Sequence, residues 1–405
     1  MPSRRHFLAA GTSITAAACL ARDADGAPSP PAVKIVRVET VPVVYPTVGR
    51  FKFFEDAQGR PTGRQTVLVK LTADDGSIGW GQAVPIHRWS YETLETVLTT
   101  IDRYLAPVLI GLNPFDVARA HQAMNRVIAP AFSTGQPMCK AGIDLALFDL
   151  TGRILKQTAA QRWGRKGRER LTLSWTLNPV KLDDVPRLIA AGRERGYKHF
   201  NIKVAPDLTF DIELARRVKK LVPDGFLWAD ANAGYDEATA RQAVRKLADA
   251  GVAVLEQPLP PARLTGLQRL RKIGALPIIL DESVVHHTEL EEYVALRMLD
   301  GVAFKPAKVG GLTESLVQVG ICEKNDLIRL GSGLTDPDLA LAAALLLYGA
   351  CDFTRPCALN GPQFLSGSVL KKPLTAENGE MAVPDGPGLG VEVDPDRVEQ
   401  MRLKR

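Results

Sequence analysis

Five charged residues recur along this chain at nearly constant spacing, and each of them ends a short apolar segment. They are Lys203, Asp230, Glu256, Asp281 and Lys305, and subtracting successive position numbers gives gaps of 27, 26, 25 and 24 residues. One strand, one helix and two loops occupy about that length, and βα units repeated in this way build a parallel barrel. Because the C-terminal ends of barrel strands meet at one mouth, the spacing predicts that all five side chains converge.

Three of the five residues are carboxylates that should leave the apolar core at strand ends. An unpaired carboxylate in such a position is costly, so it needs a cation or strong hydrogen-bond donors. Asp230, Glu256 and Asp281 supply about half of an octahedral Mg²⁺ shell, and Mn²⁺ can substitute for Mg²⁺. For any one of these acids alone, a salt bridge or a helix cap is the competing interpretation.

The two lysines flank the carboxylates in chain order and should lie on opposite sides of an eight-stranded ring. Removing a proton α to a carboxylate produces an enediolate, which a bound cation stabilises. Lys203 and Lys305 can take that proton only when they are partly neutral, and we expect burial and a nearby cation to lower their pKa values. Two opposed bases favour racemisation or epimerisation, whereas one base and one supporting cation favour cycloisomerisation or syn-elimination. A surface or ion-paired lysine is the alternative for each.

The composition is that of an ordinary globular protein, with 45% hydrophobic and 24% charged residues among 405. The net charge of +6 is mild and no long basic run is present, which argues against nucleic-acid binding. Beyond the N-terminal segment, Cys139, Cys322, Cys351 and Cys357 have no metal-finger spacing. We therefore expect buried free thiols at these four positions.

The first 31 residues read as an export signal and a linker. Arg4 and Arg5 precede a short, weakly apolar stretch, which resembles a twin-arginine signal and predicts a periplasmic or otherwise exported protein. The stretch is too short for a stable membrane span. A disordered basic tail is the competing interpretation, and Cys19 is a candidate lipid-anchor site with a poorly matching context.

The remaining chain is expected to form a capping domain, a barrel and a tail. The sequence pattern predicts an α+β capping domain over residues 32–165 and the barrel over residues 166–365. It predicts a tail over residues 366–405 that packs on the capping domain. The predicted cap elements are strands Lys34–Val44, Gln65–Thr72 and Ile78–Ala83 and helices Tyr91–Val108 and Gly135–Leu155. The barrel should begin with strand Thr172–Leu177 and contain helices at roughly 183–195, 208–222, 236–250, 263–274, 288–299, 313–324 and 337–349. Thr313 is a candidate cap of the sixth helix, and Cys351–Leu359 is the candidate eighth strand.

The motifs together resemble the enolase superfamily, in particular its mandelate-racemase-like and muconate-lactonizing members. The carriers are Ala141–Leu150 in the cap, Asn201-Ile202-Lys203, Asp230-Ala231-Asn232, Glu256-Gln257-Pro258, Asp281-Glu282-Ser283 and Lys305–Gly311. The resemblance covers nearly all of the chain after residue 32. It implies a (β/α)-barrel, a modified TIM barrel, of the α/β class with an α+β cap.

The resemblance also implies site roles. Mg²⁺ would sit on Asp230, Glu256 and Asp281, with Lys203 and Lys305 as acid and base. The partner would be a small-molecule carboxylate, and relatives commonly form homo-oligomers. Loops near Tyr45–Asp56 and Pro85–Trp89 would close over the substrate and select it. The predicted substrate contacts are Asn201, Asn232, Lys308, Ser332 and Asn360.

Several positions depart from the family pattern. Asn201 replaces the first lysine of the usual Lys-x-Lys, although Lys203 is kept. Thr335 stands where an acid is frequent after the seventh strand, which weakens a muconate cycloisomerase assignment. Asn360 lies where dipeptide epimerases carry acids, and every histidine precedes Lys305, so neither a dipeptide substrate nor the His–Asp pair of sugar-acid dehydratases fits.

We therefore predict a Mg²⁺-dependent enzyme that abstracts the proton α to a substrate carboxylate. Racemisation or epimerisation of an acyl or cyclic amino acid is the leading expectation. Cycloisomerisation of the muconate-lactonizing type and syn-dehydration are alternatives, and a non-catalytic periplasmic carboxylate-binding protein is the alternative from another class. His286-His287, after the fifth barrel strand, either contacts substrate or lies in a solvated loop.

Overall fold

The computed structural model describes residues 31–49, 51, 53–56, 58–131 and 134–404. The predicted export signal, with Arg4, Arg5 and Cys19, lies outside the described residues and stays a prediction. Within the described ranges, no helix has the length and apolar content needed to span a membrane. The four cysteines of this part of the chain are buried free thiols, as expected.

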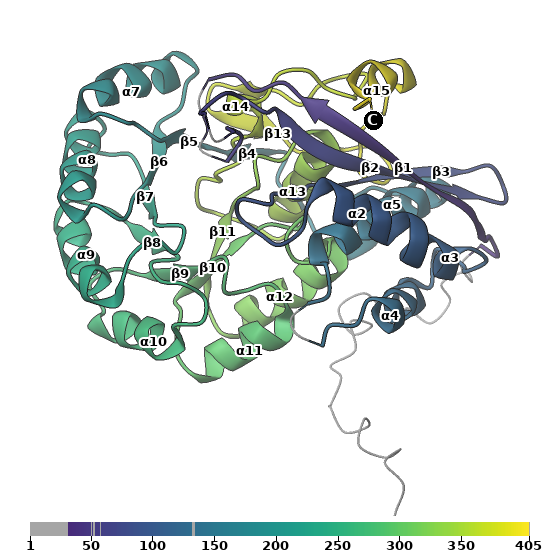
Figure 1. Cartoon of the computed structure of the whole chain (residues 1–405), viewed down its shortest axis with the longest axis horizontal. Coiled ribbons are helices and arrows are strands. Elements are labelled where there is room, and N and C mark those ends of the chain that lie inside the picture. Colours follow the sequence, from purple (N-terminus) through teal and green to yellow (C-terminus); the bar gives the residue numbers. More distant parts are fainter. Residues whose placement is uncertain (1–30, 50, 52, 57, 132–133, 405) are drawn as a thin grey trace, which may run out of the picture.

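The N-terminal part is an antiparallel meander covered by helices (Figure 1). Its elements are β1 (Ile35–Tyr45), β2 (Arg64–Ala73), β3 (Ile78–Ala83), α2 (Leu94–Thr100), a π-helical turn (Ile101–Leu105), α3 (Ala106–Leu109), α4 (Val117–Val127), α5 (Pro137–Leu155) and α6 (Ala159–Trp163). The three predicted strands are present, whereas the helix predicted over Tyr91–Val108 is divided into α2, the π-helical turn and α3. Helix α4 was not predicted.

Helix α5 is buried over most of its length because β3 packs directly against it. A Cβ atom on Gly81 would come within 2.0 Å of the Gly142 carbonyl oxygen, so only glycine permits this approach. The first turn of α5 has no side-chain cap from Gln136. Instead, the carboxylate of Glu92 accepts hydrogen bonds from the backbone N–H groups of Met138 and Cys139.

The barrel is a curled parallel sheet of seven strands in the order β5 to β11, with helices on its outer side (Figure 1). The strands are β5 (Ser174–Leu177), β6 (His199–Lys203), β7 (Leu227–Asp230), β8 (Val254–Glu256), β9 (Ile278–Leu280), β10 (Gly301–Phe304) and β11 (Ile328–Gly331). The outer elements are a 3-10 turn (Leu182–Asp184), α7 (Val185–Glu194), α8 (Leu208–Leu221), α9 (Glu237–Asp249), α10 (Leu264–Ile273), α11 (His287–Ala295), α12 (Leu312–Lys324) and α13 (Asp338–Ala350). The predicted fold class is therefore confirmed.

The two ends of this sheet differ from the sequence prediction. The first barrel strand begins at Ser174, because Arg170–Thr172 forms a separate strand, β4, that pairs with β13 (Glu380–Ala382). The predicted eighth strand is reduced to a bridging segment around Cys357 and Ala358. The Ala358 N–H donates to the Gly331 carbonyl, and the Ser174 N–H donates to the Cys357 carbonyl. These backbone hydrogen bonds join β11 to β5.

The C-terminal segment returns to the antiparallel meander. It contains α14 (Gly361–Phe364), β12 (Ala376–Glu377), β13 and α15 (Pro395–Met401). The Leu403 N–H donates to the Pro42 carbonyl on β1, and the Leu389 N–H donates to the buried Asp149 carboxylate on α5. The C-terminal segment therefore packs against β1 and α5.

A single buried carboxylate connects α5 to the start of α12. Asp144 accepts hydrogen bonds from the Leu312 and Thr313 backbone N–H groups and from the Thr313 hydroxyl, and it pairs with His121 at 2.8 Å. The prediction that Thr313 caps this helix is wrong, because Thr313 lies within α12 and Gly311 holds the N-cap position without a side chain. The backbone N–H groups of the first turn, which have no partner within the helix, are therefore satisfied by a side chain from another part of the chain.

Replacing Asp144 should therefore cost more stability than removing an ordinary helix cap. We expect Asp144→Ala to lower the free energy of unfolding by about 3 kcal/mol, because several buried donors lose their acceptor. Asp236→Ala, which removes the exposed N-cap of α9, should lower it by about 1 kcal/mol. Urea unfolding measures both values, and equal losses would contradict the linking role of Asp144.

Glu92 should make stability depend on pH. Burial raises the pKa of Glu92 to about 7, although its two backbone N–H donors act in the opposite direction. The folded state then keeps a proton that the unfolded chain loses, so this contribution is full below about pH 4.5 and disappears as the pH rises to about 7. Across that window the wild type should lose roughly 3 kcal/mol relative to Glu92→Gln. Glu95→Gln, on α2, is the control and should keep the wild-type slope.

Candidate active site

The five regularly spaced residues lie together at the C-terminal ends of neighbouring strands. Lys203, Asp230 and Glu256 are the last residues of β6, β7 and β8, and the parallel pairing sets them side by side in register. Asp281 and Lys305 directly follow β9 and β10. Each strand consists of a few mostly buried residues, and the charged side chain lies at the point where that apolar segment ends.

The three carboxylates are almost completely buried, with exposed fractions of 2%, 1% and 0% for Asp230, Glu256 and Asp281. One oxygen of Glu256 accepts from the Trp228 indole N–H at 2.7 Å, while its Oε1 has no hydrogen-bond partner among the described residues. Burial, followed by the charge of Asp230, raises the pKa of Glu256 well above its usual range. An acid of this kind favours a cation at its free oxygen.

Each lysine forms an ion pair with one of the acids. Lys203 donates to Asp230, and Lys305 donates to Asp281 with its Nζ 3.9 Å from Oε1 of Glu256. Burial alone would lower the pKa of both lysines, but the neighbouring carboxylates outweigh it and raise the pKa above the ordinary value. The expected lowering of the lysine pKa values depends on a nearby cation as well as on burial, so it stays a prediction for the cation-bound site.

Asp281 is held in place by a second lysine and by an amide. Lys308 donates to the Asp281 carboxylate at 2.8 Å and to its backbone carbonyl at 2.6 Å. The Gln257 side-chain oxygen accepts from the Asp281 and Ser283 backbone N–H groups. Gln257 has φ of +34°, a conformation that non-glycine residues rarely adopt and that is frequent at functional sites. Lys308 therefore orients the Asp281 carboxylate, and its ammonium group is occupied by hydrogen bonds to Asp281.

A cavity of about 560 Å³ lies between the barrel and the N-terminal part, and its lining includes Lys308 but none of the five regularly spaced residues. Phe53, Trp89 and Met138 line it from one side, and Asn232, Glu282 and Lys308 from the other. Both loops predicted to close over a substrate contribute to this lining. The Trp89 indole N–H donates to Glu282 at 2.9 Å, and the Trp89 ring lies 5.0 Å from the Lys305 ammonium. Trp89 thus links the covering loop to the lysine.

The structure brings two of the five predicted substrate contacts to this cavity, Asn232 and Lys308. Asn201, Ser332 and Asn360 are buried nearby but do not line it. The side-chain oxygens of Asn201 and Asn360 have no hydrogen-bond partner in the described part of the chain, and Asn360 donates weakly to Thr176 at 3.3 Å. Ser332 meets the buried Tyr348 hydroxyl through its backbone carbonyl.

Two acids at the site were missed by the sequence analysis as functional candidates. Glu282 lines the cavity, and burial, with help from the charges of Asp281 and Asp230, raises its pKa to about 7. The position of Glu282 within the Asp281-Glu282-Ser283 motif is the sequence feature that could have identified it as a functional candidate. Asp336 follows β11 and is 2% exposed, one position beyond Thr335.

Asp336 is a buried carboxylate with little local support. Apart from a weak approach by the Leu334 backbone N–H, neither of its oxygens meets a donor within the described ranges. Burial raises the pKa of Asp336, and the charges of Arg64 and then Lys305 partly oppose this. A carboxylate that contributes so few hydrogen bonds to the fold is better explained by a role in binding than by a role in stability.

The donor set fits a hard divalent cation. Three carboxylates lie at neighbouring strand ends without a thiolate or imidazole ligand, and Glu256 Oε1 is a buried oxygen that no donor occupies in the described residues. Oxygen ligands of this type suit Mg²⁺ or Mn²⁺. Lys203 and Lys305 now provide the positive charge that these acids require.

Comparison with known proteins places this arrangement in a family. The model of the mandelate racemase / muconate lactonizing enzyme N-terminal domain matches residues 49–164, and the enolase C-terminal domain-like model matches residues 184–397. The chain therefore belongs to the mandelate racemase / muconate lactonizing enzyme family of the enolase superfamily, a family of enzymes.

The relatives cover most of both chains. A chloromuconate cycloisomerase of Cupriavidus necator is 32% identical over 82% of this chain and 90% of its own length. Muconate cycloisomerase 1 of Acinetobacter baylyi is 30% identical over 90% of this chain and 98% of its own length. The crystal structure of 2-chloromuconate cycloisomerase from Rhodococcus opacus superposes with a TM-score of 0.84 at 28% identity, covering 92% of this chain and all of that one.

Substitutions at Asp336 and Asp338 should separate a binding carboxylate from a structural one. Asp338 accepts hydrogen bonds from the Tyr45 hydroxyl, the Ser368 hydroxyl and the Val369 N–H. We expect Asp338→Asn to lower the free energy of unfolding by roughly 3 kcal/mol, whereas Asp336→Asn should change it by less than about 1 kcal/mol. Chemical denaturation measures both, and a large loss for Asp336→Asn would show that Asp336 is structural.

Proposed function

We propose that this chain is a Mg²⁺-dependent cycloisomerase that interconverts an unsaturated carboxylate and its lactone through an enediolate. The observation that carries the proposal is the placement of three buried carboxylates at adjacent strand ends, with a lysine paired at each side. Similarity along most of the chain to chloromuconate and muconate cycloisomerases supports cycloisomerisation over the racemisation that the sequence analysis favours.

Asp230, Glu256 and Asp281 would hold Mg²⁺, or Mn²⁺ in its place, and the ion supplies positive charge that stabilises an enediolate. With their carboxylates engaged in this way, Lys203 and Lys305 lose the partners that now raise their pKa values. A lysine that is partly neutral at ordinary pH is the base required at the α-carbon. Metal binding by the three carboxylates would therefore control the protonation of the two lysines.

The lysines carry out the proton transfers. In the ring-opening direction, one lysine Nζ takes a proton from the carbon next to the free carboxylate of the lactone. The electron pair forms the C=C double bond, and the ring C–O bond breaks so that the ring oxygen leaves as part of a second carboxylate. In the ring-closing direction, that carboxylate adds to the double bond, and the same ammonium group returns the proton to the α-carbon. The other lysine stays charged beside the reacting oxygens. Trp89 and Phe53 cover the cavity and exclude water from the enediolate.

The substrate proposed here differs from muconate. Thr335 replaces the acid that is frequent at this position in the family, and the adjacent acid Asp336 is buried. Ring closure still requires a second substrate carboxylate. We therefore expect an unsaturated dicarboxylate whose substituents differ from those of muconate.

Racemisation or epimerisation of an acyl or cyclic amino acid is the second candidate. Lys203 on β6 and Lys305 after β10 are separated by the three intervening strands that carry the carboxylates. Each lysine is paired with its own acid, which is the arrangement that two opposed bases would require. No comparable observation favours syn-dehydration, and membership in a family of enzymes argues against a protein that only binds carboxylates.

Solvent-proton exchange tests the proposal. Proton NMR in D₂O, with Mg²⁺ present, would follow the protons next to the free carboxylate of carboxymethyl γ-lactones, including muconolactone, and the α-proton of N-acyl amino acids. We expect exchange at the carbon next to the free carboxylate of a lactone, and this exchange should be lost when EDTA removes the metal. One of the variants Lys203→Ala and Lys305→Ala should slow exchange by about 100-fold or more. Lys198→Ala, at an exposed lysine just before β6, is the control.

The pattern across variants separates the two candidates. Loss of exchange in one lysine variant, with ring opening in the wild type, supports the cycloisomerase. Inversion of an N-acyl amino acid that requires both lysines supports the racemase instead. Wild-type exchange rates in both lysine variants, or exchange that survives metal removal, would contradict the proposed chemistry.

Export and assembly complete the proposal. We propose export through the twin-arginine signal on the basis of Arg4 and Arg5, and a homo-oligomer on the basis of the family resemblance. Neither rests on a contact in the described part of the chain.

A further inference from the structure

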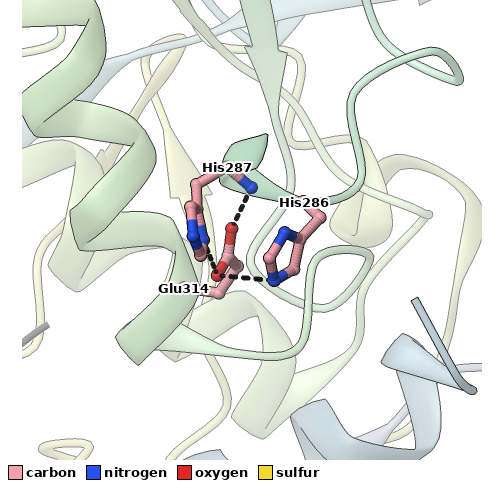
Figure 2. A group of neighbouring side chains, drawn as sticks. All are labelled: His286, His287 and Glu314. Atoms are coloured by element: carbon pink, nitrogen blue, oxygen red, sulfur yellow. Dashed lines mark hydrogen bonds and ion pairs between the residues drawn. The ribbon is translucent and has the colours of Figure 1, made fainter. Parts of the chain in front are cut away.

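Three potential metal ligands meet outside the candidate active site, between the first turns of α11 and α12 (Figure 2). His286 and His287 begin α11, and Glu314 lies in the first turn of α12. One ligand atom from each residue falls within 4.8 Å of the other two. We propose that His286, His287 and Glu314 form a second metal site, selective for a borderline divalent ion such as Zn²⁺ or Co²⁺.

The geometry is close to that of a metal centre. His287 Nδ1 lies 2.9 Å from Glu314 Oε2, and His286 Nε2 lies 3.8 Å from the same oxygen. Ligands bound tetrahedrally at about 2.0 Å from zinc are roughly 3.3 Å apart, which falls between these two distances. Both imidazole rings face the same carboxylate oxygen in Figure 2, so small side-chain movements bring the three atoms around one ion.

The surroundings orient the carboxylate for this purpose. Oε1 of Glu314 accepts from the His287 backbone N–H at 2.5 Å and from the buried Gln318 amide at 3.1 Å. These donors fix one oxygen and leave Oε2 for the ion. Outer hydrogen bonds of this kind hold the ligands of known metal sites in position.

The two histidines can present unprotonated nitrogens to an ion. His286 Nδ1 lies 3.2 Å from the Thr288 hydroxyl, so a proton on Nδ1 has an acceptor and Nε2 keeps its lone pair. That tautomer gives up the hydrogen bond that Nδ1 now accepts from the Thr288 backbone N–H. His287 already directs Nδ1 at Glu314, and binding an ion replaces this one hydrogen bond.

The ligand chemistry separates this cluster from the three carboxylates. Two imidazoles and one carboxylate suit Zn²⁺ and Co²⁺, whereas Mg²⁺ and Ca²⁺ prefer oxygen ligands alone. The side chains of His286 and His287 are 39% and 32% exposed, so an ion can enter from solvent and keep a water ligand. Glu289 and Glu291 add negative charge near the histidines.

An ion bound by this cluster would connect two helices of the barrel, α11 and α12. Helix α11 follows the loop that begins at Asp281, and α12 follows the loop that begins at Lys305. An ion held by residues of both helices therefore ties together the segments that carry one predicted metal ligand and one predicted base. We expect it to stabilise this side of the barrel mouth without touching the cavity, whose lining includes none of the three residues.

Cobalt binding tests the site directly. The full chain would be kept in excess Mg²⁺, so that the carboxylates are occupied, and titrated with Co²⁺ while visible absorption and heat are recorded. We expect one Co²⁺ equivalent with the intense bands of low coordination number, and Zn²⁺ should displace it. His286→Asn, which keeps a helix-capping side chain, and His287→Gln should each weaken this binding by more than about 100-fold.

A matched control is present in the chain. His121 pairs with Asp144 at 2.8 Å, a histidine–carboxylate pair without a second histidine, so His121→Gln should leave the Co²⁺ signal unchanged. Zn²⁺ should also raise the melting temperature of the wild type and not that of His287→Gln. Equal Co²⁺ affinity and spectra in the wild type and both cluster variants would overturn the proposal, as would the absence of Co²⁺ binding in excess Mg²⁺. No substrate is involved, so the outcome is independent of the proposed reaction.

Discussion

The burial of three carboxylates side by side is the constraint on which the rest of this site depends. Asp230 and Glu256 are adjacent in the strand register, and Asp281 follows the next strand, with almost no exposure to solvent for any of them. Like charges at such separation repel strongly at low dielectric, which is why the pKa of Glu256 is raised by burial and by Asp230. Positive charge must be supplied locally, and Lys203, Lys305 and the family's expected cation are the available sources.

The surrounding structure controls the geometry of these charges. Trp228 fixes one oxygen of Glu256, and Gln257 and Lys308 fix Asp281, so each acid is oriented before a ligand arrives. The N-terminal meander contributes through Trp89, which contacts both Glu282 and Lys305 from the far side of the cavity. The barrel therefore holds the reacting groups, and the covering part contacts them through Trp89.

The sequence predicted the elements whose pattern is repeated along the chain. The βα spacing predicted the barrel and placed Lys203, Asp230 and Glu256 at neighbouring strand ends. Residues that are one βα unit apart in the sequence lie at the same level on neighbouring strands of a parallel barrel. Long-range contacts were not predictable in this way. Asp144 caps α12 from α5, and β4 leaves the barrel to pair with β13, and neither choice is encoded near the residues concerned.

Side-chain environment was equally hidden from the sequence. The raised lysine pKa values arise from the sum of several carboxylates, which spacing alone does not give. Asp336 was overlooked because its neighbour Thr335 occupies the position compared with the family, and only its burial without donors within the described chain draws attention to it. Asn201, Ser332 and Asn360 were predicted to contact the substrate, yet none of them lines the cavity.

Anomalous diffraction from a Mn²⁺-soaked crystal tests the central claim most directly. The account predicts one strong peak between the Asp230, Glu256 and Asp281 carboxylates, with the Lys203 and Lys305 ammonium groups released from their ion pairs and turned toward the cavity. A peak elsewhere, or carboxylates that remain paired with the two lysines while Mn²⁺ is absent from between them, would contradict it.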